Sequence, residues 1–403
     1  MRIISDMPIM QPPPCLMVIL NDVLSDIVAK GEVIERYYNP DDVFKTVHIV
    51  LVNNDKPDLA SLVKIAGQAQ LFIHNLPPWH QFIWRTLGCR QWLLRKWALP
   101  AVSLAGKIRP SIIRCFGVGL NGWLALEIKR SLGIPYIVSL HTHPDANIQL
   151  HSPRLKERIR QHLFASTDCL VLKNAEKVIP VYHAIASYLR RLNVTQYTVL
   201  HNVINAPFLY KKERYSIDGV AKVLCVGQQI LGKNPENLLR AIATIANIHL
   251  TLIGDGPIHD KLIVLSNKLG IADRVKFVCT MPNDILCSDL HNYDIFAVVN
   301  EYPGISKAML EALLCGLPVI HNRIKGYDVR ELESCSALLV DNTEEAYRIA
   351  LIKLISDEAL RLSMGTSERL YAEAQWEPKR LEEEYASIYR KLIAIQNNNE
   401  NKK

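Results

Sequence analysis

An acidic side chain inside an otherwise apolar helical segment is the feature of this chain with the clearest chemical meaning. Glu311 lies within residues 303–320 (PGISKAMLEALLCGLPVI) and is flanked by Leu310, Ala312 and Leu313. A carboxylate in apolar surroundings must accept hydrogen bonds or lose its charge. A vicinal diol such as a nucleotide ribose offers two O–H donors to one carboxylate, so we expect Glu311 to hold a ribose. A glutamate on the solvated edge of the helix is the alternative.

The residues around Glu311 predict one β-strand–helix–β-strand unit. The apolar run 295–299 precedes a Pro-Gly turn, a helix follows Ser306, and Gly316 and Pro318 end it before the apolar pair Val319-Ile320. Such a helix begins at the carboxyl edge of a parallel sheet, where its free N–H groups favour phosphate. The predicted donor contacts at this helix start are Gly304, Ile305, Ser306 and Lys307.

A lysine six residues after a strand is a second candidate for phosphate binding. The segment VGQQILGKNPENLLRAI ends a strand at Gly227 and places Lys233 just before a helix with Asn234 and Pro235 at its start. An ammonium group at the mouth of the sheet is well placed for a diphosphate. An ordinary exposed loop lysine is the alternative.

A glycine turn between a strand and an amphipathic helix marks a third loop of the same kind. The turn GDGP comprises Gly254, Asp255, Gly256 and Pro257 and precedes a helical pattern over 258–268. Glycines there let a ligand approach the backbone. Strand-to-helix turns use Gly and Asp in any case, so the position of the turn carries more weight than its composition.

Alternating strands and helices in both halves of the chain predict two doubly wound α/β domains. Apolar runs that predict strands occupy 47–52, 70–73, 111–116, 136–140 and 178–181 in the first half, and 222–226, 248–253, 275–278 and 295–299 in the second. The polar stretch 205–219 separates the halves. We therefore expect an N-terminal acceptor-side domain over 1–208, a donor domain over 209–378, a final helix over 379–395 that packs back on the first domain, and a disordered tail over 396–403.

Composition and charge narrow the functional classes. The chain has 403 residues, 49% hydrophobic and 22% charged, and nine Cys without a CxxC pair, which favours a soluble cytoplasmic protein without a disulfide framework or zinc ribbon. No signal peptide and no spanning apolar segment are expected. Residues 1–210 hold 23 Lys and Arg against 14 Asp and Glu, whereas residues 211–403 hold 24 against 26. This asymmetry indicates an anionic partner for the first domain.

Two other patterns in the first half leave alternatives open. His141 and His143 project to one side if their strand continues, which would suit a metal, but no carboxylate set accompanies them, so a structural or substrate-contacting His141 is preferred. GVGLNG at 117–122 matches a dinucleotide fingerprint, but the next strand ends at His141 instead of an acidic residue. A tight turn is therefore preferred to an NAD site.

The segment 79–97, WHQFIWRTLGCRQWLLRKW, mixes Trp with basic residues. Its members include Trp84, Arg85, Trp92, Arg95 and Lys96. This mixture suits either an anionic membrane surface or a core helix with solvated basic side chains, and the sequence leaves both open. A nucleic-acid partner is not expected, because no binding motif for RNA or DNA accompanies the charge.

Taken in order, these motifs resemble the donor domain of retaining GT-B glycosyltransferases of glycosyltransferase family 4, also described as glycosyl transferases group 1. The resemblance runs from about Pro135 to Leu392 and includes VLHNVIN at 199–205 and Trp376-Glu377. It implies a GT-B fold of two Rossmann-like domains that face across a cleft. It also implies transfer of a sugar from a nucleotide-diphosphate donor with retention, without a cofactor or metal.

The same resemblance implies roles for three residues as a catalytic set. Lys233 would contact the donor diphosphate, Glu311 would hold the ribose and His141 would lie near the transferred sugar. Gly227, Gln228 and the 254–256 turn would complete the donor site.

The chain departs from the family pattern at three places. Pro303 stands eight residues before Glu311 where the family has Glu, Gln228 replaces an arginine, and the N-terminal loop reads PIMQPPP instead of carrying Gly-Gly. Proline has no N–H to offer a phosphate. A catalytically degenerate binding or scaffold protein and a nucleotide-sugar epimerase therefore stay as alternatives to a glycosyltransferase with a lipid-linked or polysaccharide acceptor.

Overall fold

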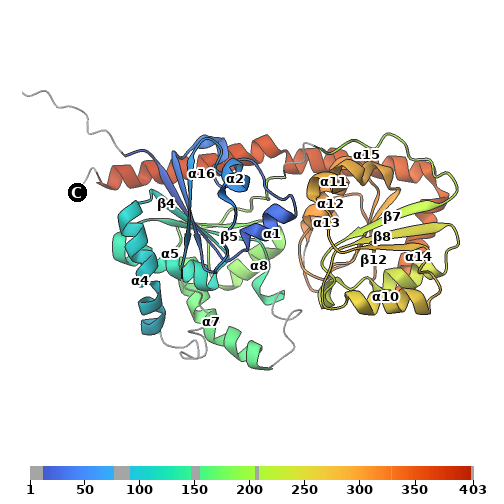
Figure 1. Ribbon diagram of the computed structural model, residues 1–403, viewed down its shortest axis with the longest axis horizontal. Helices are drawn as coiled ribbons and strands as arrows, with labels where there is room; N and C mark the ends of the chain where they lie inside the picture. Colours follow the sequence, from blue (N-terminus) through green and yellow to red (C-terminus); the bar gives the residue numbers. More distant parts are fainter. Residues whose placement is uncertain (1–11, 77–90, 147–154, 205–207, 328, 401–403) are drawn as a thin grey trace, which may run out of the picture.

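The chain folds into two lobes, each built on a six-stranded parallel sheet (Figure 1). The computed structural model describes residues 12–76, 91–146, 155–204, 208–327 and 329–400. The first sheet has the order β3-β2-β1-β4-β5-β6 and the second β12-β11-β10-β7-β8-β9. When the strands of each lobe are counted from its first strand, both sheets have the order 3-2-1-4-5-6. This is the connectivity of the doubly wound fold. The prediction of two facing Rossmann-like domains is confirmed.

The N-terminal lobe carries helices on both faces of its sheet. Its strands are β1 (Cys15–Leu20), β2 (Thr46–Leu51), β3 (Gln70–Asn75), β4 (Ile112–Phe116), β5 (Tyr136–Leu140) and β6 (Lys177–Pro180). Its helices are α1 (Leu24–Ala29), α2 (Leu59–Leu62), α4 (Gln91–Ile108), α5 (Gly119–Leu132), α7 (Leu155–Asn174) and α8 (His183–Arg191), with 3-10 turns η1 (Pro40–Asp42) and η2 (Val63–Ala66).

The C-terminal lobe repeats this arrangement. Its strands are β7 (Ala221–Val226), β8 (Ile248–Ile253), β9 (Val275–Val278), β10 (Ile295–Val298), β11 (Val319–Asn322) and β12 (Leu338–Val340). Its helices are α9 (Glu236–Ala243), α10 (His259–Lys268), α11 (Asn283–Asp289), α12 (Lys307–Cys315), α13 (Arg330–Glu333), α14 (Glu344–Ser356) and α15 (Glu358–Trp376), with 3-10 turns η3 (Leu231–Lys233) and η4 (Leu290–Asn292).

One sequence interpretation was wrong for the residues that the structure describes: Pro12, Pro13 and Pro14 do not belong to a loop at the carboxyl end of a strand. Cys15–Leu20 forms the central strand β1, and all six of its residues are buried, as expected for a parallel strand covered on both faces. The described prolines 12–14 precede that strand, at its amino end. The loop at its carboxyl end is 21–23, which leads into α1, so the prolines have no bearing on phosphate binding.

The last helix, α16 (Pro378–Glu400), returns to the N-terminal lobe (Figure 1). The Tyr385 hydroxyl donates to the Leu200 carbonyl at 3.2 Å, and the Tyr389 ring lies 5.0 Å from that of Phe44. The helix was expected to end at residue 395, with a disordered tail after it. Instead, residues 396–400 continue the helix, so this part of the expectation was wrong.

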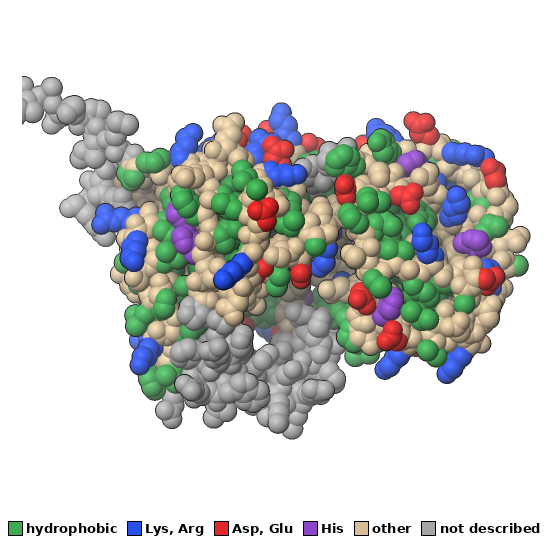
Figure 2. Space-filling model, viewed as in Figure 1, with side chains coloured by type: hydrophobic (Ala, Val, Ile, Leu, Met, Phe, Trp, Pro, Cys, Tyr) green, Lys and Arg blue, Asp and Glu red, His purple; other side chains and the backbone are tan. Residues whose placement is uncertain are grey.

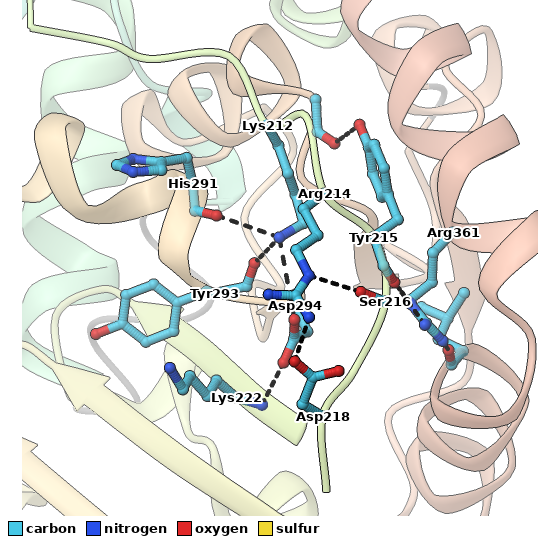
Figure 3. Close-up of polar contacts among 12 residues, drawn as sticks. Lys212, Arg214, Tyr215, Ser216, Asp218, Lys222, His291, Tyr293, Asp294 and Arg361 are labelled. Carbon is cyan, nitrogen blue, oxygen red and sulfur yellow. Dashed lines mark hydrogen bonds and ion pairs between the residues drawn. The ribbon is translucent and has the colours of Figure 1, made fainter. Parts of the chain in front are cut away.

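The segment that follows the N-terminal lobe is fixed to the C-terminal lobe by side chains (Figure 3). Lys212 is buried, and its ammonium donates to the carbonyls of Tyr293 at 2.5 Å and His291 at 3.2 Å. The Arg361 guanidinium donates to the Tyr215 carbonyl, and the Tyr215 hydroxyl donates to the Gly316 carbonyl at 2.8 Å. Residues 212–216 therefore move with the end of α12. A hinge in this first crossing between the lobes would therefore lie before residue 212.

Candidate active site

A cavity of about 470 Å³ lies where the two lobes meet. Most of its wall comes from the N-terminal lobe, including Tyr37, Phe116 and His141, and α12 of the C-terminal lobe adds Lys307 and Leu310. Its volume is in the range of ordinary small-molecule sites. On the face shown in Figure 2, acidic and basic side chains of the described residues are mixed over both lobes.

The loop that leads into α12 is held by two buried asparagines. The Asn300 backbone N–H donates to Asn322 Oδ1 at 2.7 Å, and Asn322 Nδ2 donates to the Asn300 carbonyl at 2.9 Å. Asn300 Nδ2 in turn donates to the carbonyls of Tyr302 and Gly304. These bonds join the ends of β10 and β11 and fix the path of the backbone before the helix.

The same loop touches the N-terminal lobe. The Tyr182 hydroxyl donates to the Ile305 carbonyl at 2.5 Å. Gly304 has φ +156°, and a Cβ atom built there would lie 2.8 Å from the Tyr182 ring. Only glycine fits this approach of the two lobes.

The helix α12 begins after Ser306 as predicted, Ser306 caps it, and Glu311 is buried in its second turn. Ser306 Oγ accepts from the Met309 N–H at 3.2 Å. Glu311 is fully buried; its Oε1 accepts from Asn283 Nδ2 at 2.9 Å and lies 3.8 Å from the Lys307 ammonium. Its Oε2 has no partner among the described residues. Burial raises the pKa of Glu311, and the Lys307 ammonium opposes that rise.

Lys233 is a half-buried cation without an anionic partner among the described residues. Its ammonium lies 5.7 Å from the centroid of the Tyr302 ring. Among the described residues, it makes no hydrogen bond or ion pair. Burial alone lowers its pKa. Tyr302 comes two residues before Gly304, so Lys233 lies beside the loop that leads into α12.

The two glycine turns of the predicted donor site pack against each other. A Cβ atom at Gly254, where φ is +139°, would lie 2.0 Å from the Gly227 carbonyl oxygen. One at Gly256 would lie 2.4 Å from the carbonyl oxygen of Gln229. Gln228 continues the first turn, and Asp255 is exposed in the second. The two turns after β7 and β8 therefore meet backbone to backbone, with the side chains of Gln228 and Asp255 exposed beside them.

His141 lines the cavity as a neutral imidazole. Its Nε2 has no partner among the described residues, and its ring lies 5.2 Å from that of Phe116. Burial, aided by the nearby Arg114 guanidinium, lowers the pKa of His141 to about 3. His143 instead hydrogen-bonds to Ser187 Oγ at 3.2 Å. The two histidines have different partners, so the structure gives no support to a metal site made by this pair.

The predicted site residues do not all share one hollow. His141 and Lys307 line the cavity between the lobes, whereas Lys233 and Glu311 do not. Glu311 lies with Lys307 and Asn283, and Lys233 lies with Gly227 and Tyr302. Sequence reasoning missed Tyr182, Asn283, Asn300 and Asn322.

The GVGLNG turn is closed to a pyrophosphate by a side chain of its own lobe. The Gly119 N–H, at the start of α5, donates to Asp168 Oδ1 at 3.0 Å. A carboxylate therefore occupies the end of the helix where an anion would bind. The preference for a tight turn over an NAD site agrees with this contact.

The basic aromatic segment falls partly on α4. Trp92 is 58% exposed and Lys96 is exposed, whereas Arg95 lies 3.6 Å from Glu127 and Trp97 is buried. Trp84 and Arg85 lie outside the described residues. Within the described part, no helix is long and apolar enough to cross a membrane.

Comparison with known proteins assigns a family to each lobe. Residues 46–207 match glycosyltransferase family 4, and residues 210–370 match glycosyl transferases group 1. An uncharacterized glycosyltransferase of Methanocaldococcus jannaschii is 26% identical over 285 residues, 68% of this chain and 76% of that protein. A GDP-mannose-dependent phosphatidylinositol monomannoside mannosyltransferase of Mycolicibacterium smegmatis is 26% identical over 41% of this chain and 47% of its own length.

Solved structures share the fold at low identity. Sucrose-phosphate synthase from Thermosynechococcus elongatus superposes with a TM-score of 0.76 at 19% identity, over 95% of this chain and all of that one. Anabaena HepE, solved in complex with UDP-glucose, has a TM-score of 0.68 at 13% identity, over 94% of this chain and 99% of that one. With the paired sheets and the family matches on both lobes, the chain belongs to the GT-B glycosyltransferases of family 4.

Proposed function

We propose that this chain transfers a sugar from a nucleotide-diphosphate donor to an acceptor hydroxyl, with retention of configuration. The observation that carries the proposal is the Lys233 ammonium, half-buried and without an anionic partner among the described residues. A buried charge without a partner is costly. A donor diphosphate would supply that partner.

The start of α12 is the second source of positive potential. Gly304 and Ile305 lead into the helix, and Ser306 caps it. The free N–H groups of the first turn and the helix dipole favour an anion there. During transfer, negative charge grows on the leaving diphosphate, and fixed donors aimed at that charge lower the barrier.

Glu311 and His141 would orient the rest of the donor. The Glu311 Oε2 atom has no hydrogen-bond partner among the described residues, so it can accept a hydrogen bond from a ribose O–H. The Asn283 side chain, which donates to Oε1, would have to move aside for the nucleoside. His141 stays neutral at physiological pH, since its pKa is lowered to about 3. Its unpartnered Nε2 can therefore hydrogen-bond to the transferred sugar without adding charge.

The cavity between the lobes would take the acceptor. Its wall is largely aromatic and aliphatic, with the carboxylates of Asp22 and Glu32 and the ammonium of Lys307. Carboxylates accept hydrogen bonds from hydroxyl groups. A hydroxylated acceptor with an apolar portion suits this wall.

The comparisons support the donor class indirectly. HepE was solved with UDP-glucose, and the mycobacterial relative uses GDP-mannose by its name. Both proteins take a sugar linked to a nucleoside diphosphate, which supports the same donor class here.

Association with an anionic membrane surface is part of the proposal, through the exposed Trp92 and Lys96 of α4. Flotation with anionic liposomes tests it. Trp92→Ala combined with Lys96→Ala should lower the bound fraction, and binding unaffected by that pair would remove the membrane proposal.

A donor panel tests the reaction. The protein is incubated with UDP-, GDP- and ADP-sugars, with and without glycan and lipid-linked acceptors, and release of nucleoside diphosphate is followed. We expect release from one nucleotide class, and a product whose anomeric configuration by proton NMR equals that of the donor. Nucleotide binding without turnover would favour the degenerate binding protein that Pro303 suggests, and a changed donor without an acceptor would favour an epimerase.

A further inference from the structure

Two histidines and a glutamate meet at the junction of the lobes. His183 is the first residue of α8, His201 follows α8 in the N-terminal lobe, and Glu331 lies on α13 of the C-terminal lobe. One ligand atom of each lies within 4.8 Å of the other two. Both lobes therefore contribute to one cluster of metal-ligating groups.

His201 is held in the form that binds a metal. Its Nδ1 is 2.7 Å from the Val181 carbonyl oxygen. A carbonyl only accepts, so Nδ1 carries the hydrogen and Nε2 keeps a free lone pair. The ring is 8% exposed and packs edge-on against Trp376, with centroids 5.6 Å apart. Fixing of one ring nitrogen by a backbone carbonyl is the usual support of a histidine ligand.

Glu331 has an unused oxygen in the same place. The residue is 2% exposed, and its Oε1 accepts from the His183 backbone N–H at 2.8 Å and lies 2.9 Å from His183 Nδ1. Its Oε2 has no partner among the described residues. A buried carboxylate oxygen without a donor is costly and asks for an explanation.

We propose that His183, His201 and Glu331 bind a divalent transition-metal ion of the zinc class, which clasps the two lobes together. Two imidazoles and one carboxylate are an established ligand set for zinc, with a fourth position left for water. The His183 side chain is 41% exposed, so the open position faces solvent and the ring is free to adjust. On binding, His183 takes the neutral tautomer that carries its hydrogen on Nε2, and the lone pair of Nδ1 binds the metal.

One of the three ligand separations is already close to the value that such an ion needs, and the other two lie within 4.8 Å. Zinc–nitrogen and zinc–oxygen bonds of about 2.0–2.2 Å at tetrahedral angles place ligand atoms roughly 3.3 Å apart. The separation of 2.9 Å between His183 Nδ1 and Glu331 Oε1 therefore has to open by only a few tenths of an ångström. A small rotation of the half-exposed His183 ring provides this change.

We expect the bound metal to link the N-terminal lobe to the C-terminal lobe across the cleft. Tyr182, next to His183, already donates to the Ile305 carbonyl in the loop before α12. The Glu331 carboxylate already accepts from the His183 backbone N–H, and a metal on His183 and Glu331 would strengthen that link and fix the start of α8 against α13. This inference goes beyond sugar transfer and does not rest on it. It departs from the sequence expectation of no metal, which considered only His141 and His143.

A second cluster in the described part of the chain serves as the internal comparison. Asp255, His259 and Cys279 also place ligand atoms within 4.8 Å of one another. There, both His259 nitrogens have partners, Gln229 Oε1 at 2.8 Å and Cys279 Sγ at 3.8 Å. Asp255 and Cys279 are exposed, so this cluster lacks the buried, unpartnered oxygen of the first.

Titration of the full-length, metal-free protein with Co²⁺ tests the proposal. We expect visible absorption typical of four- or five-coordinate Co²⁺, saturation at one equivalent per chain, displacement by Zn²⁺, and a higher melting temperature with Zn²⁺. His183→Asn keeps the backbone bond to Glu331 and should weaken Co²⁺ binding by more than about 100-fold, since loss of a supporting group alone costs 10–100-fold. Glu331→Gln should do the same, and His259→Asn should not change the affinity.

Three outcomes would overturn the proposal. One is the absence of a saturable Co²⁺ spectrum in the wild-type protein. Another is binding that His259→Asn abolishes and His183→Asn leaves intact, which would place the metal at the second cluster. The third is full binding by both His183→Asn and Glu331→Gln when circular dichroism shows them folded. Sugar transfer is not used as a readout, so failure of the clasp and failure of the proposed function are separate results.

Discussion

Replacing Lys233 by methionine should separate binding of the donor from stability of the fold. Methionine keeps most of the length and apolar contact of the side chain and removes its charge. The Lys233 ammonium is half-buried and makes no hydrogen bond or ion pair among the described residues. The free protein therefore loses no hydrogen bond or ion pair in the variant, only the contact of the ammonium with the Tyr302 ring. The complex with a diphosphate loses a charge-assisted hydrogen bond as well.

The size of the effect follows from one charge-assisted hydrogen bond. Such a bond contributes about 1.5–3 kcal/mol, which corresponds to roughly 10- to 150-fold weaker binding of a nucleoside diphosphate. Where the ammonium also stabilises charge that develops on the leaving group, kcat should fall by about 10²–10³. The melting temperature of the free variant should stay equal to that of the wild type or rise, since an unpaired buried charge is removed.

Isothermal titration with UDP and GDP, together with thermal denaturation, measures both quantities. Lys268→Met is the matched control, because Lys268 is an exposed lysine of the same lobe at the end of α10; it should change neither. Unchanged affinity in Lys233→Met, or loss of more than about 2 kcal/mol of stability, the range of structural lesions, would refute the reasoning.

Three further predictions concern neighbouring residues. Because the pKa of His141 is lowered to about 3, the pH profile of kcat should show no inflection from this residue between pH 5 and 8. His141→Ala should lower kcat and leave nucleotide affinity unchanged. If the wild-type pH profile has an inflection near neutral pH that the variant lacks, the prediction is contradicted. Burial raises the pKa of Glu311 above its ordinary value of 4.5, so the folded state binds more protons than the unfolded state between that value and the raised pKa. The free energy of unfolding should therefore fall as pH rises through this range. Glu311→Gln should flatten this pH dependence in calorimetry, and an unchanged pH dependence would count against the prediction. Gly304→Ala should lower the free energy of unfolding by about 1–3 kcal/mol, because the new Cβ atom would lie 2.8 Å from the Tyr182 ring. In denaturant titrations, Tyr182→Ala should restore part of that stability in the double variant. Full additivity of the two changes would show that the residues do not interact.

Sequence patterns predicted the elements whose apolar runs are bounded by Gly or Pro. The unit from β10 through α12 to β11 was predicted with its helix beginning after Ser306 and ending at Gly316, and the structure has both. Local signals suffice there, since caps and αL glycines act within one turn of the helix.

β1 was missed for a physical reason. Its six apolar residues follow a proline run. A buried parallel strand lacks the alternation of apolar and polar residues, so its sequence cannot be distinguished from another short apolar segment near the start of the chain. The three-residue strand β12 (Leu338–Val340) is too short to carry any pattern.

The site was only partly predictable, because its contacts join distant segments. Glu311 and Lys307 are four residues apart on one helix, so their proximity follows from helical spacing. Asn283, which binds both, comes from α11, and Tyr182, which meets Gly304, comes from the other lobe. Packing of the lobes decides these contacts, and no local spacing encodes it.

A crystal structure of the protein with bound UDP or GDP tests the central claim most directly. We expect a diphosphate oxygen within hydrogen-bond distance of Lys233 Nζ, about 2.7–3.2 Å, another facing the N–H groups at the start of α12, and a ribose hydroxyl on Glu311. A nucleotide bound with Lys233 and Glu311 both out of reach would contradict the account.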